Sequence, residues 1–323
     1  MAATITETLN SQYSFMVREK VGPYDNYFKA TPFYDAIMSS GNKLPAIGKE
    51  QVDVIFEYTY NPNSGSIGEN GEVSIASVDP YQGAYVDWRT VYVALPISHR
   101  KMHMSLESDF FGYVEALVSN SKKSIRAELA RQLYLDGTGN SGLDMPGIAS
   151  VISTDPTTGT IYNVLDRSLA ANAWARNKYR TSCGSVATYG EQYLNDINIQ
   201  CSNGSIVPDT LYTDKTTFGY LRRSGLAYEA SARGEGGTLN VGYTGYRVFG
   251  MDVVADDNCP SGYIYCLNMK NSWKLQPLKG EEFVIYDFTD EPRKQTSIWR
   301  MYLTAVTYCT MPYANGITSG WTA

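Results

Sequence analysis

Histidine is nearly absent from this chain: its 323 residues include two, His99 and His103. General acid–base catalysis draws most often on histidine or on carboxylates gathered in a pocket, and the carboxylates here are scattered. The two histidines are four residues apart, but no Glu follows His99 as a zinc protease requires, and there is no third histidine. We therefore expect two surface histidines between a strand and a helix, with no enzyme activity, metal or cofactor.

Paired cysteines, long apolar runs and an excess of basic residues are also lacking. Five cysteines without CxxC spacing predict buried thiols rather than a metal cluster or a disulfide framework. No stretch approaches 18 uncharged apolar residues and no signal peptide is evident, so we expect a protein made in the cytoplasm with no membrane span. A net charge of −6 argues against a protein that grips nucleic acid, although a wall that faces DNA is compatible with it.

Two short motifs have both a chemical and a structural interpretation. Gly137, Gly139 and Gly142 fit the dinucleotide pattern G-x-G-x-x-G, which needs a strand before it and a helix after it. Here a predicted helix precedes the motif, so we interpret it as a helix-terminating turn. Residues 256–258 (Asp-Asp-Asn) could contribute to a calcium site, but the following Pro260 favours a turn.

Tyrosine is abundant, with 26 residues, as is typical of strands and interfaces. Apolar residues alternate with polar ones over Gln51–Tyr60 and again over Tyr85–Ile97, and this period of two predicts strands. The segment between them is rich in glycine and proline and is too long for a loop inside a compact domain. We expect a hairpin arm that projects from the body and rests on another molecule, because an isolated ribbon is poorly stable.

The clearest predicted helix follows Ser105 and ends at the glycine-rich turn over residues 136–142. Its apolar residues recur at spacings of three and four, which predicts one buried stripe along a rod about 45 Å long. We expect this stripe to be core: Leu106, Phe110, Val114, Leu117, Val118, Ile125, Leu129 and Leu133.

The rest of the chain mixes short helices and strands, which predicts an α+β fold. Helices are expected over Tyr34–Ser39, over Thr188–Gln200 with a capping box of Thr188 and Glu191, and after Asp214 as N-cap. A glycine-dense segment from Gly234 to Gly245 is expected to be a loop. Strands are expected at Asp209–Thr213, Tyr246–Val254, Tyr263–Leu267, Glu282–Phe288 and Trp299–Thr310.

The order of these parts resembles the major capsid proteins of tailed bacterial viruses with the Hong Kong 97-type fold. Five segments are similar to those of that group: 133–139 (LYLDGTG) with 145–148 (MPGI), 162–168 (YNVLDRS) with Trp174, 207–209 (VPD) with Asp214, 249–256 (FGMDVVAD) with 260–265 (PSGYIY), and 311–316 (MPYANG). Three residues depart from the group's pattern: Met251, Asp252 and Tyr313.

The resemblance implies an N-terminal arm (1–50), an extended loop (51–97), a peripheral domain (98–146 and 256–323) and an axial domain (147–255). It implies assembly into pentamers and hexamers that form the icosahedral head of a virion and enclose DNA without sequence-specific binding. A portal protein and a cement protein are implied partners. A separate scaffolding protein is expected as well, because the chain has no room for a scaffold before its arm. Assembly contacts are expected at the loop tip: Gly65, Gly68, Glu69, Gly71 and Glu72.

No lysine occurs between Lys49 and Lys101, so we expect no lysine-dependent cross-link from the loop, unlike in some relatives. Two alternatives stay open at this point. One is an encapsulin-like nanocompartment shell, which has the same fold and holds cargo in place of DNA. The other is an aromatic-rich ligand-binding module, which would be a monomer with a concave aromatic groove.

Overall fold

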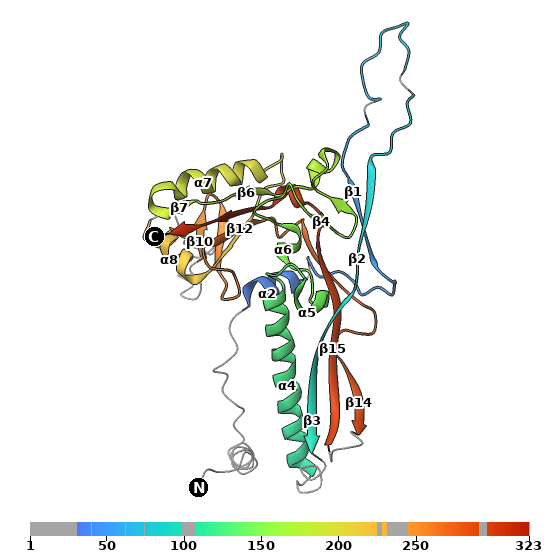
Figure 1. Cartoon of the computed structure of the whole chain (residues 1–323), viewed down its shortest axis with the longest axis vertical. Coiled ribbons are helices and arrows are strands. Elements are labelled where there is room, and N and C mark those ends of the chain that lie inside the picture. Colours follow the sequence, from blue (N-terminus) through green and yellow to red (C-terminus); the bar gives the residue numbers. More distant parts are fainter. Residues whose placement is uncertain are drawn as a thin grey trace, which may run out of the picture.

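The computed structural model describes residues 31–39, 41–61, 63–73, 75–98, 107–224, 228–230, 245–290 and 296–322. The molecule is elongated, with a narrow ribbon projecting at one end and a long helix beside long strands at the other (Figure 1). A compact part with two helices over a sheet lies to one side. No helix in the described residues is long and apolar enough to cross a membrane.

The long predicted helix is α4 (Glu107–Gln132), whose 26 residues give a rod about 39 Å long. It contacts β3 (Arg89–Ser98), the edge strand of an antiparallel sheet. The central strand of this sheet is β15 (Thr296–Cys309), which pairs with β3 along its first ten residues. On its other side β15 pairs with β14 (Val284–Asp290) and then with β13 (Trp273–Pro277).

The strand predicted over 85–97 is confirmed in part: nearly all of it is β-strand, but two strands with different partners share the segment. Its beginning belongs to β2 (Tyr81–Val86), which pairs with β1 (Val52–Glu57) in a separate two-stranded ribbon. Its larger part is β3, which pairs with β15. Asp87 and Trp88 separate the two strands, and the alternation changes phase between them: the buried residues are Ala84 and Val86 in β2 but Val91, Leu95 and Ile97 in β3.

The compact part is built on a seven-stranded sheet. Its strands, in the order in which they lie side by side, are β6 (Lys178–Arg180), β16 (Gly316–Ser319), β12 (Tyr263–Leu267), β8 (Thr210–Thr213), β11 (Met251–Ala255), β10 (Gly245–Val248) and β9 (Tyr228–Ala230). α7 (Val186–Cys201) packs on β6 and β16, and α8 (Lys215–Arg223) packs on β11. The expected domain boundary between residues 255 and 256 therefore does not follow the sheets, because β12 and β16 return to the sheet of β8 and β11.

The predicted cap of α8 is confirmed, and the predicted capping box of α7 is wrong. The Asp214 carboxylate accepts from the backbone N–H groups of Thr216 and Thr217. α7 begins at Val186, two residues before Thr188, and its N-cap Ser185 makes no side-chain capping bond. The pattern T-x-x-E also occurs at positions inside a helix, as it does here, so the pattern alone does not identify the N-cap.

The single strand predicted over 246–254 is a tight hairpin of β10 and β11. Phe249 and Gly250, the two residues between the strands, both have positive φ, of 48° and 84°. This conformation matches the right-handed twist of two paired strands. The apolar Phe249 concealed the turn in the sequence.

The other elements are short, and the buried apolar residues form two clusters. The smaller joins α7 and α8 to the seven-stranded sheet, and the larger joins other residues of that sheet, such as Tyr212 and Tyr265, to β1, α4 and β15. The short elements are α2 (Pro32–Met38), α5 (Gly139–Gly142), α6 (Ile148–Val151), β4 (Thr160–Ile161), β5 (Leu165–Asp166), η1 (Ala170–Ala175), β7 (Gly184–Ser185), η2 (Pro312–Ala314) and β17 (Trp321–Thr322).

Of the residues predicted to form the stripe on α4, Ile125, Leu129 and Leu133 are fully buried. Leu117 and Val118 are half-buried. Phe110 and Val114 lie in α4, but their side chains are outside the described part. Also outside it are Leu106, both histidines, the expected cap Ser105 and the segment Gly234–Gly242.

The predicted buried thiols are confirmed: all five cysteines are buried and unbridged. Burial raises the pKa of the Cys201 thiol to about 12 and has the same effect on Cys309. The turn at 256–258 is also confirmed. Buried Asp256 accepts from the Asn258 N–H at 2.9 Å and from the Phe33 N–H at 3.4 Å, so this carboxylate fastens α2 to the body.

Candidate assembly surface

The segment between β1 and β2 extends far from the rest of the molecule (Figure 1). Several large apolar side chains on it are exposed: Ile75 is 92% exposed, Tyr60 80% and Val73 67%. Exposed apolar side chains gathered on one segment are typical of an interaction surface, so this loop is the candidate contact surface of the subunit. The loop-tip residues predicted as contacts, Gly65, Gly68, Glu69, Gly71 and Glu72, are all exposed.

The ribbon and its loop are uniformly acidic. Residues 51–88 contain six carboxylates (at 53, 57, 69, 72, 79 and 87) and no Lys or Arg. Among the described residues, one ion pair involves this segment, between Asp53 and Lys49 at 3.4 Å, at the base. The rest of the loop therefore presents negative charge beside exposed apolar side chains.

A group of aromatic rings anchors the ribbon to the body. Trp174, in η1, packs against the end of β1 that leads into the loop, with ring centroids 5.2 Å from Phe56 and 5.9 Å from Tyr58. Phe56 also stacks on Tyr162 at 5.8 Å. The Tyr162 hydroxyl donates to the Cys309 carbonyl and accepts from the Cys309 N–H, both at 2.7 Å. The base of the loop is thus connected through aromatic contacts to the long strand β15.

Arg167 organises the turn that carries Tyr162. Its side chain is 5% exposed and donates to the Val151 carbonyl at 2.7 Å. Arg176 donates from Nε to the Arg167 carbonyl at 2.9 Å, which holds the chain between β5 and η1. The segment 162–168 and Trp174, which carried part of the sequence resemblance, therefore form one structural unit beneath the loop.

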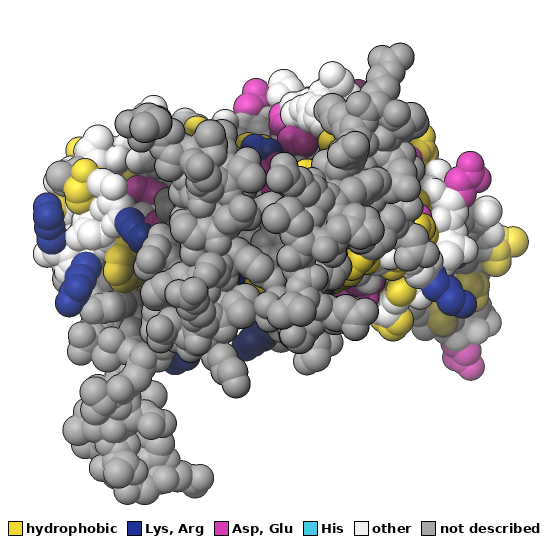
Figure 2. All heavy atoms as spheres, turned by 90° about the horizontal axis from the view of Figure 1, so that it is seen from below, with side chains coloured by type: hydrophobic (Ala, Val, Ile, Leu, Met, Phe, Trp, Pro, Cys, Tyr) yellow, Lys and Arg dark blue, Asp and Glu magenta, His cyan; other side chains and the backbone are white. Residues whose placement is uncertain are grey.

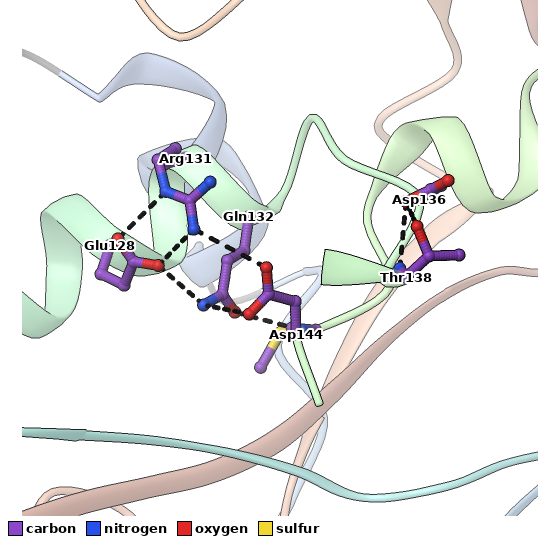
Figure 3. Close-up of polar contacts among 7 residues, drawn as sticks. Glu128, Arg131, Gln132, Asp136, Thr138 and Asp144 are labelled. Carbon is purple, nitrogen blue, oxygen red and sulfur yellow. Dashed lines mark hydrogen bonds and ion pairs between the residues drawn. The ribbon is translucent and has the colours of Figure 1, made fainter. Parts of the chain in front are cut away.

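The C-terminal end of α4 is held by a polar network (Figure 3). Arg131 donates to Glu128 from Nε at 3.1 Å, and its Nη2 lies 3.7 Å from the Asp144 carboxylate. Gln132 donates to Glu128 at 2.9 Å and accepts from the Met145 N–H at 3.0 Å. These contacts fold the chain after the glycine turn back onto the helix, and the Arg131 hydrogen bond lowers the pKa of Glu128.

The glycine motif is the turn that ends α4, as predicted. Gly137 has φ of 83°, and Asn140, Ser141 and Gly142 follow one another in the left-handed region. A run of three such residues reverses the chain sharply.

Two hollows lie around this turn. The first, of about 870 Å³, is bounded by the base of the ribbon, the glycine turn and the β4–β5 hairpin, and Arg89 and Arg167 line it together with Asp87, Asp136 and Asp144. The second, of about 800 Å³, lies between β3 and the end of α4 and shares Arg89 and Asp144 with the first.

The basic side chains of the described part lie at several separate places when the molecule is seen from below (Figure 2).

Comparison with solved structures gives likeness over nearly the whole chain at low sequence identity. The capsid asymmetric unit of cyanophage A-1(L) superposes with a TM-score of 0.72 and 10% identity, covering 93% of this chain and 95% of that chain. The capsid of a native GTA particle gives a TM-score of 0.64 and 13% identity, over 94% and 96%. The chain has the Hong Kong 97-type capsid fold.

An encapsulin is among the similar structures as well. The SrpI encapsulin of Synechococcus elongatus PCC 7942 superposes with a TM-score of 0.53 and 9% identity, covering 95% of each chain. No protein-family model matches the sequence, and no curated protein matches it. The α+β class and the resemblance inferred from short motifs are therefore confirmed by three-dimensional likeness, at identities where sequence comparison finds nothing.

Sequence reasoning missed the aromatic anchor and the two arginines of the first hollow. Trp174 was noticed as part of a motif, but its partners Phe56 and Tyr58 lie more than a hundred residues earlier. No local pattern connects them, because the contact exists only after η1 packs beneath the ribbon.

Proposed function

We propose that this chain is the major capsid protein of a tailed bacteriophage and assembles into the icosahedral shell around its DNA genome. The observation that carries the proposal is an extended loop with exposed apolar side chains on a subunit that has a capsid fold. Arms that lie across neighbouring subunits distribute contact over several partners, so weak contacts give a stable closed assembly. Pentamers and hexamers, a separate scaffolding protein, a portal and a cement protein are part of the same proposal.

The acidic balance supports a container that does not bind its contents tightly. Net charge is −6, and the described basic side chains seen in Figure 2 are spread apart. Tight DNA binding needs clustered Lys and Arg that release counterions from phosphates. In this proposal the shell faces DNA, is assembled in the host cytoplasm and performs no catalysis. The four-part division into arm, extended loop, peripheral domain and axial domain also stays a proposal.

The test is expression of the chain alone and with a scaffolding protein, followed by size-exclusion chromatography and negative-stain electron microscopy. We expect closed shells, or rings of five and six subunits. A variant in which a two-residue Asn-Gly turn replaces residues 64–78 keeps β1 and β2 and should fold but not close shells. A monodisperse monomer under every condition, or normal shells from the shortened variant, would contradict the proposal.

A nanocompartment shell is the second candidate, favoured by the likeness to the SrpI encapsulin. Purified particles distinguish the two: packaged DNA and a portal vertex support the phage capsid, and an enclosed protein cargo supports the nanocompartment. The aromatic binding module required a concave aromatic groove. Among the described residues, the two hollows have mixed polar and apolar linings and few aromatic rings, Tyr162 in one and Trp88 and Tyr92 in the other.

A further inference from the structure

Arg167 is a buried cation that forms no ion pair among the described residues, although the charge of the Asp155 carboxylate acts on it and opposes the effect of burial on its pKa. Its side chain donates to two neutral acceptors, the Val151 carbonyl at 2.7 Å and Asn177 Oδ1 at 3.5 Å, and its Nε has no acceptor among the described residues. Burial lowers the pKa of this guanidinium below its ordinary value. Buried charges in proteins are normally paired, because an unpaired one loses its hydration without compensation.

Arg89 lines the same hollow and also has no hydrogen bond or ion pair among the described residues. Three carboxylates lie in the same lining, but each is occupied elsewhere. Asp87 accepts from Asn163 at 3.0 Å, Asp136 accepts from Thr138, and Asp144 faces Gln132 and Arg131. The hollow is therefore lined by two guanidinium groups that form no ion pair among the described residues, the half-buried Arg89 and the buried Arg167, and it is open enough to receive a side chain from outside.

The missing carboxylates occur on the extended loop. Glu69 and Glu72 at its tip make no hydrogen bond or ion pair within the described part of the chain, and both are exposed. A loop arm of some eleven residues beyond β1 spans at most about 36–40 Å when extended. In Figure 1 the loop points away from the body, so its tip lies far from the hollow at its own base. A second copy is thus the source that fits this charge.

We infer that the hollow lined by Arg89 and Arg167 receives a carboxylate, Glu69 or Glu72, from the loop tip of a second copy of this chain. The inference rests on the proposed function, because the two copies meet only in an assembly. A carboxylate and a guanidinium form paired, charge-assisted hydrogen bonds, and these fix the position of the loop as well as holding it. The exposed apolar side chains of the loop supply contact area around that ionic contact.

A charge-exchange experiment tests the pairing. The variants are Arg89→Glu, the loop-tip pair Glu69→Arg with Glu72→Arg, and all three together, each assayed for the fraction of subunit in closed shells by sedimentation. We expect each partial variant to lower that fraction at least tenfold and the combined variant to recover at least half of it. Arg89→Gln, which removes the charge with less disturbance, should also lower it, and circular dichroism verifies folding.

The matched control is Glu50→Arg with Glu57→Arg, which changes net charge equally near the loop base and should leave shell closure within twofold of the original. Normal closure by the loop-tip variant would overturn the inference, as would a combined variant no better than its parents.

Inorganic phosphate is the second probe. If it binds the unassembled subunit through Arg89 while loop-tip charge has no effect on closure, the hollow is a free-anion site. Failure of the unaltered chain to form any shell would instead overturn the proposed function.

Discussion

Gly147 lies where the chain folds back over the last turn of α4. An added Cβ would lie 2.2 Å from the Leu133 carbonyl oxygen, and this oxygen also accepts from the Ile148 N–H at 2.7 Å. This hydrogen bond holds the helix backbone and the returning chain together, so neither can move away from the added methyl group. We therefore expect Gly147→Ala to lower the unfolding free energy of the unassembled subunit by about 2–3 kcal/mol or more. Urea denaturation measures this. Gly219→Ala, in α8 with no atom within 4 Å, should be neutral or stabilising; equal effects would contradict the steric argument.

At the same scale, Asp214 links subunit stability to pH. Burial raises its pKa, but hydrogen bonds from Thr217, Gly262 and Thr216 outweigh burial, and the net pKa lies below its ordinary value. A carboxyl whose pKa is lower in the folded state contributes stability above its unfolded pKa, and that contribution disappears as pH falls through the folded pKa. We expect Asp214→Ala to cost about 1–2 kcal/mol at pH 7. Thermal melts of the two proteins should show that the difference in stability between them narrows below about pH 4. A difference that does not change with pH would contradict this role of Asp214.

At the scale of elements, α4 depends on the buried half of its stripe. Leu129 is fully buried and Leu117 is half-buried. Leu129→Ala leaves a cavity and should cost about 2–5 kcal/mol, because the packed surroundings relax only in part. Leu117→Ala removes the same atoms and should cost less than half as much. Chemical denaturation of unassembled subunits compares the two, and a larger loss for Leu117 would mean that the exposed side of α4 is packed in solution.

The aromatic anchor makes a second prediction for an element, the ribbon of β1 and β2. Trp174→Ala removes ring contacts to Phe56 and Tyr58, which should cost about 1–3 kcal/mol. The subunit should still fold, but its loop should lose a defined direction, so we expect fewer closed shells by electron microscopy. Trp174→Phe keeps a ring in place and should recover most of the yield. Full yield from Trp174→Ala would show that the ring contacts do not orient the loop.

For the whole assembly, the absence of lysine from residues 50–100 excludes a covalent link through a loop amine. In the proposed shell, stability would then come from many non-covalent contacts, each weak alone. We expect purified shells heated in sodium dodecyl sulfate to run as a single band of monomer mass on an electrophoresis gel. A ladder of multimers that survives heating and reducing agent would contradict this.

Sequence patterns predicted the elements whose signal is local and continuous. The stripe of α4, the cap at Asp214, the strand Tyr263–Leu267 and the glycine turn all express short-range physics: side-chain periodicity, hydrogen bonding by a neighbouring side chain, or a positive φ. The projecting loop was predicted by the same reasoning, since a long glycine-rich segment between strands has no place inside a compact domain. The candidate loop contacts were therefore readable from sequence, whereas the hollow that we propose to receive them was not.

By itself the sequence determined the α+β class, the order of parts, the long helix, the projecting loop and the scarcity of catalytic side chains. Only the tertiary structure decided which strands pair and which distant residues meet. It divided residues 85–97 between two sheets, returned β12 and β16 to the sheet of β8, and placed Arg89 beside the same hollow as Arg167. The physical reason is that periodicity specifies which face of an element is buried but not against what. The partner is selected by the packing of the whole chain, in which contacts more than a hundred residues apart compete at once.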